Sequence, residues 1–553
     1  MSVIAPNSDV ILLKVPLEMS EDHQLTFANA TAQYNYFNGL PATSKKAFDK
    51  FTYQRKDSTI RLPELIDNLY GFNYVMYRNT NYSTKWFYAY ITDLEYVNDS
   101  VTLVKIKTDV WQTWQFDLTY KATFVEREHV SDDTIGLHTI PESVELGEYV
   151  VNPVQDPEYP TDPTKTVDNR VIGFSAKCYV INCIYNPKGG NTKYLYTNVN
   201  GVPVSGGIWV FKSAAAMQNA IICYSNNGKL EEVNNVYMLP QTIFDDNDLT
   251  ADTLPIGTGD ESLFYQFNGK STSKDFTYTL TRPTKLDGYT PVNNKMYTAP
   301  YMFINVSNNA GSTNAYSYEL FSSPSNIQFK AKGAASVGAS AITVPLNYKG
   351  VAENYSEGIM AGKYPTLSWS GDSYTNWLTQ NAVNIGVGVV GDIVGAGVSA
   401  ATGNYLADSN AEKMIANAKA GTGLFNNIGS TLGQIYKHSI APYTSQGNTN
   451  GGDVMSGMNA NTCYAYAMSI RSEYAKVIDK FFSMFGYKVN TVKTPNITGR
   501  TNWNYVKTIG CYIEANIPQD DLAEIKAMFD RGVTFWHNPT TFADYSQSNS
   551  IVS

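Results

Sequence analysis

The stretch WFYAYITDLEYVNDSVTLVKIKTDVWQTW, Trp86–Trp114, decides the fold class of this chain. It consists of two runs rich in aromatic and β-branched residues, which favour strands. The runs meet at Asn98-Asp99-Ser100, and turn residues between two such runs are typical of a β-hairpin. We therefore predict two paired strands here and a mainly β protein.

Other parts of the chain repeat this signal. Strand patterns recur in VIGFSAKCYVINCIY (Val171–Tyr185), YMFINV (Tyr301–Val306) and WNYVKTIGCYIEANI (Trp503–Ile517). The chain also holds 40 tyrosines, against 41 lysines and arginines together. Tyrosine favours strands and subunit contacts, where a rigid apolar ring carries a polar tip. We therefore expect a β-rich protein that assembles with itself.

Two helices are predicted in the C-terminal quarter, on either side of the strand at Trp503–Ile517. Each has apolar residues at helical spacing and a glycine that ends it. Asp520 and Asp521 suit the positive start of the second helix. The first helix is predicted from Ile470, Tyr474, Val477, Ile478 and Phe481 with its end at Gly486, and the second from Leu522, Ile525 and Phe529 with its end at Gly532. The expected fold class is mainly β with some helices.

Composition indicates a folded protein of several domains. The chain has 553 residues, of which 43% are hydrophobic and 16% charged, a balance that excludes a disordered protein. Its formal charge of −9 argues against a tight grip on nucleic acid, which needs Lys and Arg at the phosphates. The same charge suits a passage through which nucleic acid must slide. The N-terminal MSVIAPNSDVILLKVPLEMS lacks the pattern of a signal peptide, so secretory export is not expected.

No pattern typical of a cofactor or a metal site is present in the sequence. The five cysteines are scattered, without a CxxC pair, and we expect free, mostly buried thiols at Cys178, Cys183, Cys223, Cys463 and Cys511. The five histidines have no metal-ligand spacing, and hydrolase, protease, P-loop and dinucleotide motifs are absent from the sequence. We expect neither a cofactor nor a catalytic site.

The strongest acid/base cluster is Glu126–His129, with the sequence EREH. Alternation along a strand places Glu126 and Glu128 on one face, and a carboxylate pair could hydrolyse a glycosidic bond. A charged strand edge or a subunit salt bridge is a much commoner role for such a pattern. We therefore expect a structural role for this cluster.

The most unusual segment is NAVNIGVGVVGDIVGAGVSAATG, Asn381–Gly403. As a helix, Ala382–Ala401 would span roughly 30 Å, the thickness of a bilayer core. Its glycines weaken a helix by up to about 1 kcal/mol each, and Gly391 and Gly395 form the GxxxG spacing that lets helices pack closely in lipid. The alternative is a buried, glycine-rich helix or loop of the core.

The residues after this segment favour a releasable excursion from the fold. Leu424, Ile428, Leu432 and Ile435 recur at helical spacing and predict an amphipathic helix. The polar, glycine-rich run Gln446–Asp453 then has the composition of a flexible linker. Two apolar pieces joined by polar turns therefore predict a long excursion late in the chain.

Three blocks of sequence resemble one family. DVWQTWQFD (Asp109–Asp117), FVEREHV (Phe124–Val130) with TIPESVELGEY (Thr139–Tyr149), and FFSMFGYKVNTVKTPNITGRTNWNYVKT (Phe481–Thr508) are similar to the major tail, or tail knob, proteins of small short-tailed bacteriophages of the picovirus type. The resemblance covers roughly the first 150 and the last 90 residues, in the order of the family.

The resemblance implies a structural virion protein, made in the host cytoplasm, that forms a β-rich homo-hexameric tube at the distal end of the tail. It implies contacts with the upper tail tube, with the host cytoplasmic membrane, and with double-stranded DNA that passes without sequence-specific binding. It also implies an apolar loop, mapped to Thr375–Met458, that plugs the lumen and then penetrates the membrane. Its lipid-seeking residues would be Ile385, Val387, Val389, Val390, Ile393, Val394 and Val398, with Leu424, Ile428 and Leu432 secondary.

Asp392 departs from a purely apolar loop. A lone charge at mid-bilayer costs at least ~2.5 kcal/mol unless it faces water or is protonated, so this residue argues against deep insertion of a single copy.

The expected division of the chain is an N-terminal tube domain at 1–151, a knob domain at 152–374, the loop at 375–458 and a C-terminal segment at 459–553 that completes the tube. A receptor-binding protein and a tail-tip enzyme that degrades the cell wall remain alternatives. Tyr185–Gly201, rich in Tyr and Asn, would suit the first.

Overall fold

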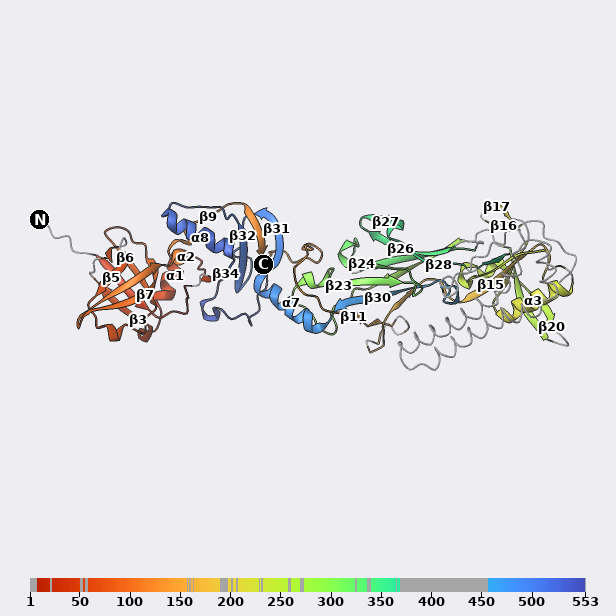
Figure 1. The fold of residues 1–553 in the computed structure, drawn as a ribbon, viewed down its shortest axis with the longest axis horizontal. Coiled ribbons are helices and arrows are strands. Elements are labelled where there is room, and N and C mark those ends of the chain that lie inside the picture. Colours follow the sequence, from red (N-terminus) through yellow and green to blue (C-terminus); the bar gives the residue numbers. More distant parts are fainter. Residues whose placement is uncertain are drawn as a thin grey trace, which may run out of the picture. The chain divides into compact units, whose positions relative to one another are not determined.

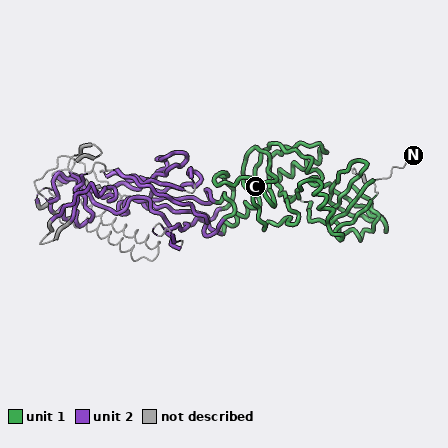
Figure 2. Tube along the Cα trace, turned by 180° about the vertical axis from the view of Figure 1, so that it is seen from behind, with its two compact units in different colours: residues 1–145, 291–296, 473–553 green, residues 146–290, 297–472 purple. Residues whose placement is uncertain are grey.

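The chain divides into two compact units. The computed structural model describes residues 7–19, 22–49, 53–54, 58–156, 158, 161–162, 164–188, 197–199, 202–204, 207–227, 229, 232–256, 260–268, 273–323, 326–335, 340–364, 366–368 and 456–552. Unit 1 consists of residues 1–145, 291–296 and 473–553, and unit 2 of residues 146–290 and 297–472 (Figure 2). Unit 1 is thus built from both ends of the chain. The four-part division expected from the sequence remains a prediction.

The first sheet of unit 1 has seven antiparallel strands in the order β3-β1-β6-β7-β8-β5-β4. Strands β3, β5, β6 and β7 are labelled in Figure 1. Both faces of this sheet pack against buried residues. Within strand β1, Val10 and Leu12 belong to one buried cluster and Leu13 belongs to another. The strands span Lys45–Asp49 (β3), Ser8–Leu13 (β1), Tyr74–Asn79 (β6), Phe87–Asn98 (β7), Val101–Thr108 (β8), Thr59–Leu62 (β5) and Tyr53–Gln54 (β4).

The hairpin predicted at Trp86–Trp114 is confirmed, with one correction. Strands β7 and β8 pair antiparallel on either side of Asp99 and Ser100. The second run ends as a strand at Thr108, however, and Val110–Trp114 form the short helix α2. The cause is local, since the carboxylate of Asp109 accepts a hydrogen bond from the backbone N–H of Gln112 at 2.9 Å and so caps the helix.

The second sheet of unit 1 has five strands in the order β2-β34-β32-β10-β31. These strands span His23–Leu25, Val533–Trp536, Trp503–Ile509, Thr123–Glu128 and Tyr487–Lys493. Helix α8, Gln519–Arg531, packs on one face of this sheet through a cluster that includes Leu522, Ile525, Phe529, Val506 and Phe535. The predicted second helix, its apolar face and its end at Gly532 are therefore confirmed. Unit 1 also contains helix α1 (Ala30–Asn38) and the pair of β9 (Thr119–Tyr120) with β33 (Ile513–Glu514).

The first predicted C-terminal helix is present as α7, Ser472–Phe485, but with a different start and face. Ile470 belongs to strand β30, and Val477 is 70% exposed. The buried residues are Ala475, Ile478, Asp479 and Phe482. Asp479 is drawn inward because its carboxylate accepts backbone N–H groups of Val292 at 2.7 Å and Asn293 at 3.0 Å. The end at Gly486 is confirmed, since the backbone there has φ +64°, which glycine adopts without strain.

Unit 2 contains three larger sheets. The first joins β11 (Tyr149–Asn152), β30 (Cys463–Ile470), β23 (Met302–Ser307) and β24 (Thr313–Tyr316), with β14 (Arg170–Ile172) also paired to β30. The second runs β20 (Leu249–Ile256), β21 (Asp260–Phe267), β18 (Gly207–Phe211), β15 (Lys177–Cys183), β19 (Val233–Pro240) and β29 (Thr366–Ser368). The third joins β22 (Ser273–Leu280), β25 (Ile327–Ala334), β26 (Ser340–Tyr348) and β27 (Val351–Glu353), with β28 (Ile359–Lys363) paired to β26.

Helix α3, Ala214–Asn226, covers the six-stranded sheet of unit 2 through Met217, Ala220 and Tyr224. The described residues of unit 2 also form two short strand pairs, β12 (Val154–Gln155) with β13 (Thr166–Val167) and β16 (Thr197–Val199) with β17 (Val202–Val204). Short 3-10 turns lie at Ala42–Ser44, Ile66–Asn68, Gln241–Ile243, Asp246–Asp248, Asn294–Tyr297, Tyr318–Leu320, Tyr355–Glu357 and Pro539–Thr541.

The remaining strand predictions are confirmed, although two of the predicted strands are each divided into two shorter ones. Tyr301–Val306 corresponds to β23. Val171–Tyr185 holds the end of β14 and the whole of β15, separated at residues 173–176, where Ala176 takes a positive φ of 55°. Trp503–Ile517 holds β32 and β33. The described chain is thus mainly β with a few helices, as expected from the sequence.

Candidate functional site

Three exposed apolar side chains lie next to one another on the five-stranded sheet of unit 1. Phe124 of β10 stands opposite Val492 of β31 and opposite Ile509 of β32 in the strand register, so the three share one face of the sheet. Their exposed fractions are 36%, 66% and 58%. The neighbouring Val125 is fully buried. We call Phe124, Val492 and Ile509 the sheet patch.

Strand β31 makes this face suitable for a contact with another chain. It is the last strand of its sheet among the described residues, and its Asn490, Thr491 and Val492 are exposed. An edge strand presents backbone hydrogen-bonding groups that another chain can pair with. The backbone N–H of Lys488 is already bonded to the carboxylate of Glu142 at 2.9 Å, and only Asn490–Val492 of this strand are exposed. The sheet patch therefore combines apolar surface with a short exposed stretch of an outer strand, which suits a contact with another chain.

Two ion pairs join the strands that carry the sheet patch. Glu126 of β10 pairs with Lys507 of β32 at 2.9 Å. Glu128 is fully buried, pairs with Lys493 of β31, and accepts the backbone N–H of Asn496 at 2.9 Å. The expectation that both glutamates share one face is wrong, because the strand pairing is irregular between Val125 and Arg127. Both carboxylates therefore serve to join strands.

His129 is held in a structural role. Its Nδ1 accepts the backbone N–H of Tyr505 at 2.7 Å, and its Nε2 lies 3.0 Å from the carbonyl oxygen of Ser483, which makes Nε2 the protonated nitrogen. Burial lowers the pKa of His129 to about 3, and the charges of Arg500 and Arg127 act in the same direction. With both ring nitrogens engaged in the fold, His129 has no nitrogen left to act as a general base.

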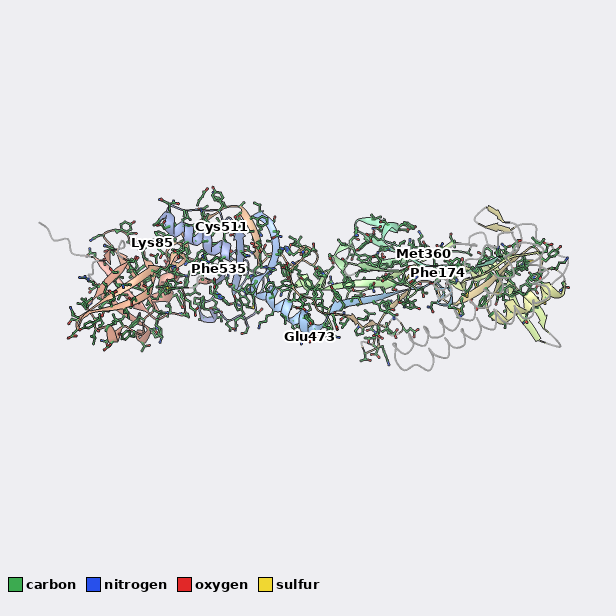
Figure 3. All side chains as sticks on the ribbon, viewed as in Figure 1. Lys85, Phe174, Met360, Glu473, Cys511 and Phe535 are labelled. Carbon is green, nitrogen blue, oxygen red and sulfur yellow. The ribbon has the colours of Figure 1, made fainter. Side chains whose placement is uncertain are left out.

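The cysteines behave as predicted. All five are free thiols, and four of them, Cys178, Cys183, Cys463 and Cys511, are buried. Burial raises the pKa of Cys463 and of Cys511 to about 11, which keeps both as neutral thiols. Cys511 lies in the cluster beneath α8 together with Phe535 (Figure 3). Within the part of the chain that the structure describes, no group of three or more His, Cys, Asp or Glu is placed to hold a metal ion.

The membrane-active residues predicted from the sequence lie outside the described residues. These are Ile385, Val387, Val389, Val390, Ile393, Val394, Val398, Leu424, Ile428 and Leu432. A search of the residues that are described finds no helix with the length and apolar character needed to cross a membrane.

The sheet patch was not predicted from the sequence. The run FVERE contains one usable signal, because strand alternation puts Phe124 on the face opposite Val125. Nothing local indicates that Val492 and Ile509 lie beside Phe124, since they join it only through the pairing of β10 with β31 and β32.

Comparison with known proteins agrees with this architecture. Residues 6–119 match the family model of the caudoviral major tail protein N-terminus, and residues 263–550 match that of the C-terminal domain of Bacillus phage phi29 tail knob protein gp9. The chain is 27% identical to the phi29 tail knob protein over 98% of each chain. It is 26% identical to the tail knob protein gp9 of Bacillus phage B103, over 96% of this chain and 97% of that one.

A solved structure shares the fold. The tail knob protein gp12 of bacteriophage C1 superposes with a TM-score of 0.65 over 99% of this chain and 100% of its own, at 14% sequence identity. The fold and the matches together place the chain among the tail proteins of bacteriophages. Within that class, it belongs to the family of the phi29 tail knob protein gp9, whose C-terminal model alone covers just over half of the chain.

The resemblance inferred from the sequence blocks is thereby confirmed. The protein is a structural component of a phage virion and is located at the tail. Its relatives are structural tail knob proteins, which agrees with the structural role of Glu126, Glu128 and His129. The assembly state, the passage of DNA and the membrane step are matters for proposal.

Proposed function

We propose that six copies of this chain form the distal tube of a short phage tail and that the viral double-stranded DNA leaves through its lumen. The observation that carries the proposal is the sheet patch, three contiguous exposed apolar residues beside the exposed stretch Asn490–Val492 of an outer strand, in a protein of the tail knob family. A ring formed from identical copies uses such a surface repeatedly around its axis. The net charge of −9 agrees with a lumen that lets DNA slide, because like charge disfavours binding to the phosphates.

The membrane step of the proposal rests on the sequence of Asn381–Gly403. Its valines and isoleucines are separated by glycines and carry one ionisable group, Asp392. Transfer of their apolar surface into lipid yields about 25 cal/mol per Å², and several copies held in one ring act multivalently. In this proposal the segment first plugs the lumen and then enters the host cytoplasmic membrane.

The described residues on either side of this segment are anchored in unit 2. Before it, β29 pairs with β19 through Thr366–Ser368. After it, Ser456 is 2% exposed and Met458 packs against the cluster beneath α3. The predicted loop Thr375–Met458 therefore includes three residues, 456–458, that are part of the folded unit. Any deletion that tests the proposal should end before Ser456.

The assembly surface can be tested by charge substitution. Ile509→Asp and Val492→Asp place a carboxylate at the proposed contact, and mass photometry of the purified proteins should show loss of the hexamer with circular dichroism unchanged. Val477→Asp is the matched control, because Val477 is 70% exposed on α7 of the same unit and outside the sheet patch. Hexamers that survive both patch substitutions would show that another surface makes the contact.

A further inference from the structure

A cavity of about 440 Å³, partly open to solvent, lies in unit 2 beside strands β11, β23 and β30, which are labelled in Figure 1. Small side chains of β30, Ala465 and Ala467, form part of its wall. In the strand register Ala465 stands opposite Arg170, and Ala467 stands opposite Asn152 and Ile304. The two alanines leave the space that larger residues would fill.

The lining of this cavity is strongly cationic. Arg170, Arg282 and Lys285 contribute to the wall, and the lining residues include no aspartate or glutamate. This contrasts with the chain as a whole, whose formal charge is −9. Lys285 is exposed, whereas Arg170 and Arg282 are partly buried, so the charges of the two arginines are the least screened by solvent.

The guanidinium of Arg282 is the most informative group. Its Nε and Nη1 are buried and have no hydrogen-bond partner among the described residues. Its Cζ lies 5.0 Å from the centre of the Tyr297 ring, a cation–π contact that supplies attraction but no hydrogen-bond acceptor. Burial lowers the pKa of Arg282, which reflects the cost of keeping this charge away from water.

Buried cations elsewhere in the protein are treated differently. In unit 1, Arg127 and Lys295 both form ion pairs with Glu142, whose side chain is fully buried. For Arg282 the carboxylates nearby in sequence are engaged in other contacts. Asp287 accepts the backbone N–H of Ser472 at 3.0 Å, and Glu319 accepts that of Ala299 at 3.2 Å. Neither Asp287 nor Glu319 lines the cavity, so its wall holds cationic groups and no carboxylate.

We propose that this cavity binds a phosphate group carried by a small organic molecule or by a unit of a polymer. Arginine guanidinium groups present planar pairs of N–H donors that match the oxygens of a phosphate. A phosphate monoester carries a charge of about −1.5 to −2 at neutral pH and three acceptor oxygens, which suits three cations better than the single charge of a carboxylate does. The volume of about 440 Å³ leaves room for an organic group beyond the phosphate itself.

Isothermal titration calorimetry of the full chain at low salt tests the site. The probes are glycerol 2-phosphate, inorganic phosphate and acetate at matched ionic strength. We expect saturable binding of both phosphates and a much weaker response to acetate. Tighter binding of the ester than of inorganic phosphate would support an organic phosphate as the ligand, whereas equal or weaker binding of the ester would overturn the organic part of the proposal. Absence of phosphate binding, or equal binding of acetate, would overturn the proposal.

Substitutions assign the binding to this cavity. Arg282→Gln and Arg170→Gln should each weaken glycerol 2-phosphate binding roughly tenfold or more, since each removes a charge-assisted hydrogen bond. Arg471→Gln is the matched control, because Arg471 forms a surface ion pair with Glu148 at 2.9 Å and does not line the cavity. Unchanged binding in both cavity variants would overturn the assignment.

A stability measurement separates a binding residue from a structural one. Arg282→Met removes a partly buried charge whose Nε and Nη1 have no hydrogen-bond acceptor among the described residues, so we expect the melting temperature of the ligand-free protein to stay the same or rise. The same variant should lose the rise in melting temperature that glycerol 2-phosphate gives the wild-type protein. A lowered melting temperature without ligand, combined with an unchanged response to ligand, would show that Arg282 serves the fold instead.

Discussion

Lys295 and Glu142 form an ion pair of 2.6 Å in which the two side chains are 2% and 0% exposed. Glu142 also pairs with Arg127 and accepts the backbone N–H of Lys488 at 2.9 Å. Burial by itself would raise the pKa of Glu142, but the hydrogen bonds from Lys295 and Lys488 and the nearby positive charges outweigh it and lower the pKa. One carboxylate thus holds together three separate parts of unit 1.

Removal of this charge should destabilise the protein strongly. Glu142→Gln leaves Lys295 buried without its counter-charge, so we expect the free energy of unfolding at pH 7 to fall by roughly 3–5 kcal/mol. Chemical denaturation measures the change. Glu524→Gln is the control, because Glu524 pairs with Lys107 at the surface of the same unit, and its loss should cost less than about 1 kcal/mol. Equal effects of the two substitutions would contradict the role given to Glu142.

Mild acid should destabilise unit 1 through His129. Its pKa of about 3 in the folded protein lies below the ordinary value of 6.5. Above pH 6.5 the His129 side chain is neutral in both the folded and the unfolded protein. As the pH falls from there toward the folded-state value, only the unfolded state takes up the proton, so stability is lost across that window. His129→Gln should therefore lower stability at pH 7 but reduce its slope between pH 6.5 and 4.5, measured by denaturation at several pH values. If the unfolding free energy of the variant changed with pH as steeply as that of the wild-type protein, His129 would not be a buried neutral side chain.

Much of the fold could be predicted where the deciding residues are close in sequence. The hairpin at Asn98-Asp99-Ser100 and helix α8 with its end at Gly532 depend on local pattern, and both are confirmed. The buried face of α7 could not be predicted, because Asp479 turns inward to bind Val292 and Asn293, far away in sequence.

The sites show the same limit. Alternation separates Phe124 from Val125 but does not say which of the two points outward, and its neighbours Val492 and Ile509 reach it only through long-range strand pairing. Arg282 carries no local signal, because what distinguishes it is the missing acceptor at buried nitrogens. The apolar segment, in contrast, is visible only in the sequence, and its role remains a prediction.

Deletion of residues 375–454, bridged by a short Gly-Ser linker, should leave the protein folded. The neighbouring residues are held in unit 2 by β29 and by the packing of Ser456 and Met458. The entropic cost of closing a loop depends only weakly on loop length, so the shorter connection should be tolerated. We expect an unchanged melting temperature and intact virions that fail to deliver DNA. Aggregation of the shortened protein would show instead that the segment belongs to the core.

A peptide covering Asn381–Gly403 should release dye from liposomes. Val390→Asp and Ile393→Asp should abolish the leakage, because each adds a charge that costs at least ~2.5 kcal/mol at mid-bilayer. Asp392→Asn should preserve or increase it, since it removes the only ionisable side chain of the segment. Leakage that persists in both charged variants would show that the segment does not enter the bilayer and acts only as a plug.

Electron microscopy of the purified full-length protein is the decisive test of the hexameric tube. We expect sixfold rings or short tubes with an open or plugged lumen, and class averages of end-on views would show the symmetry. A strictly monomeric protein at micromolar concentration and in disrupted virions, or rings of another symmetry, would contradict a hexameric conduit.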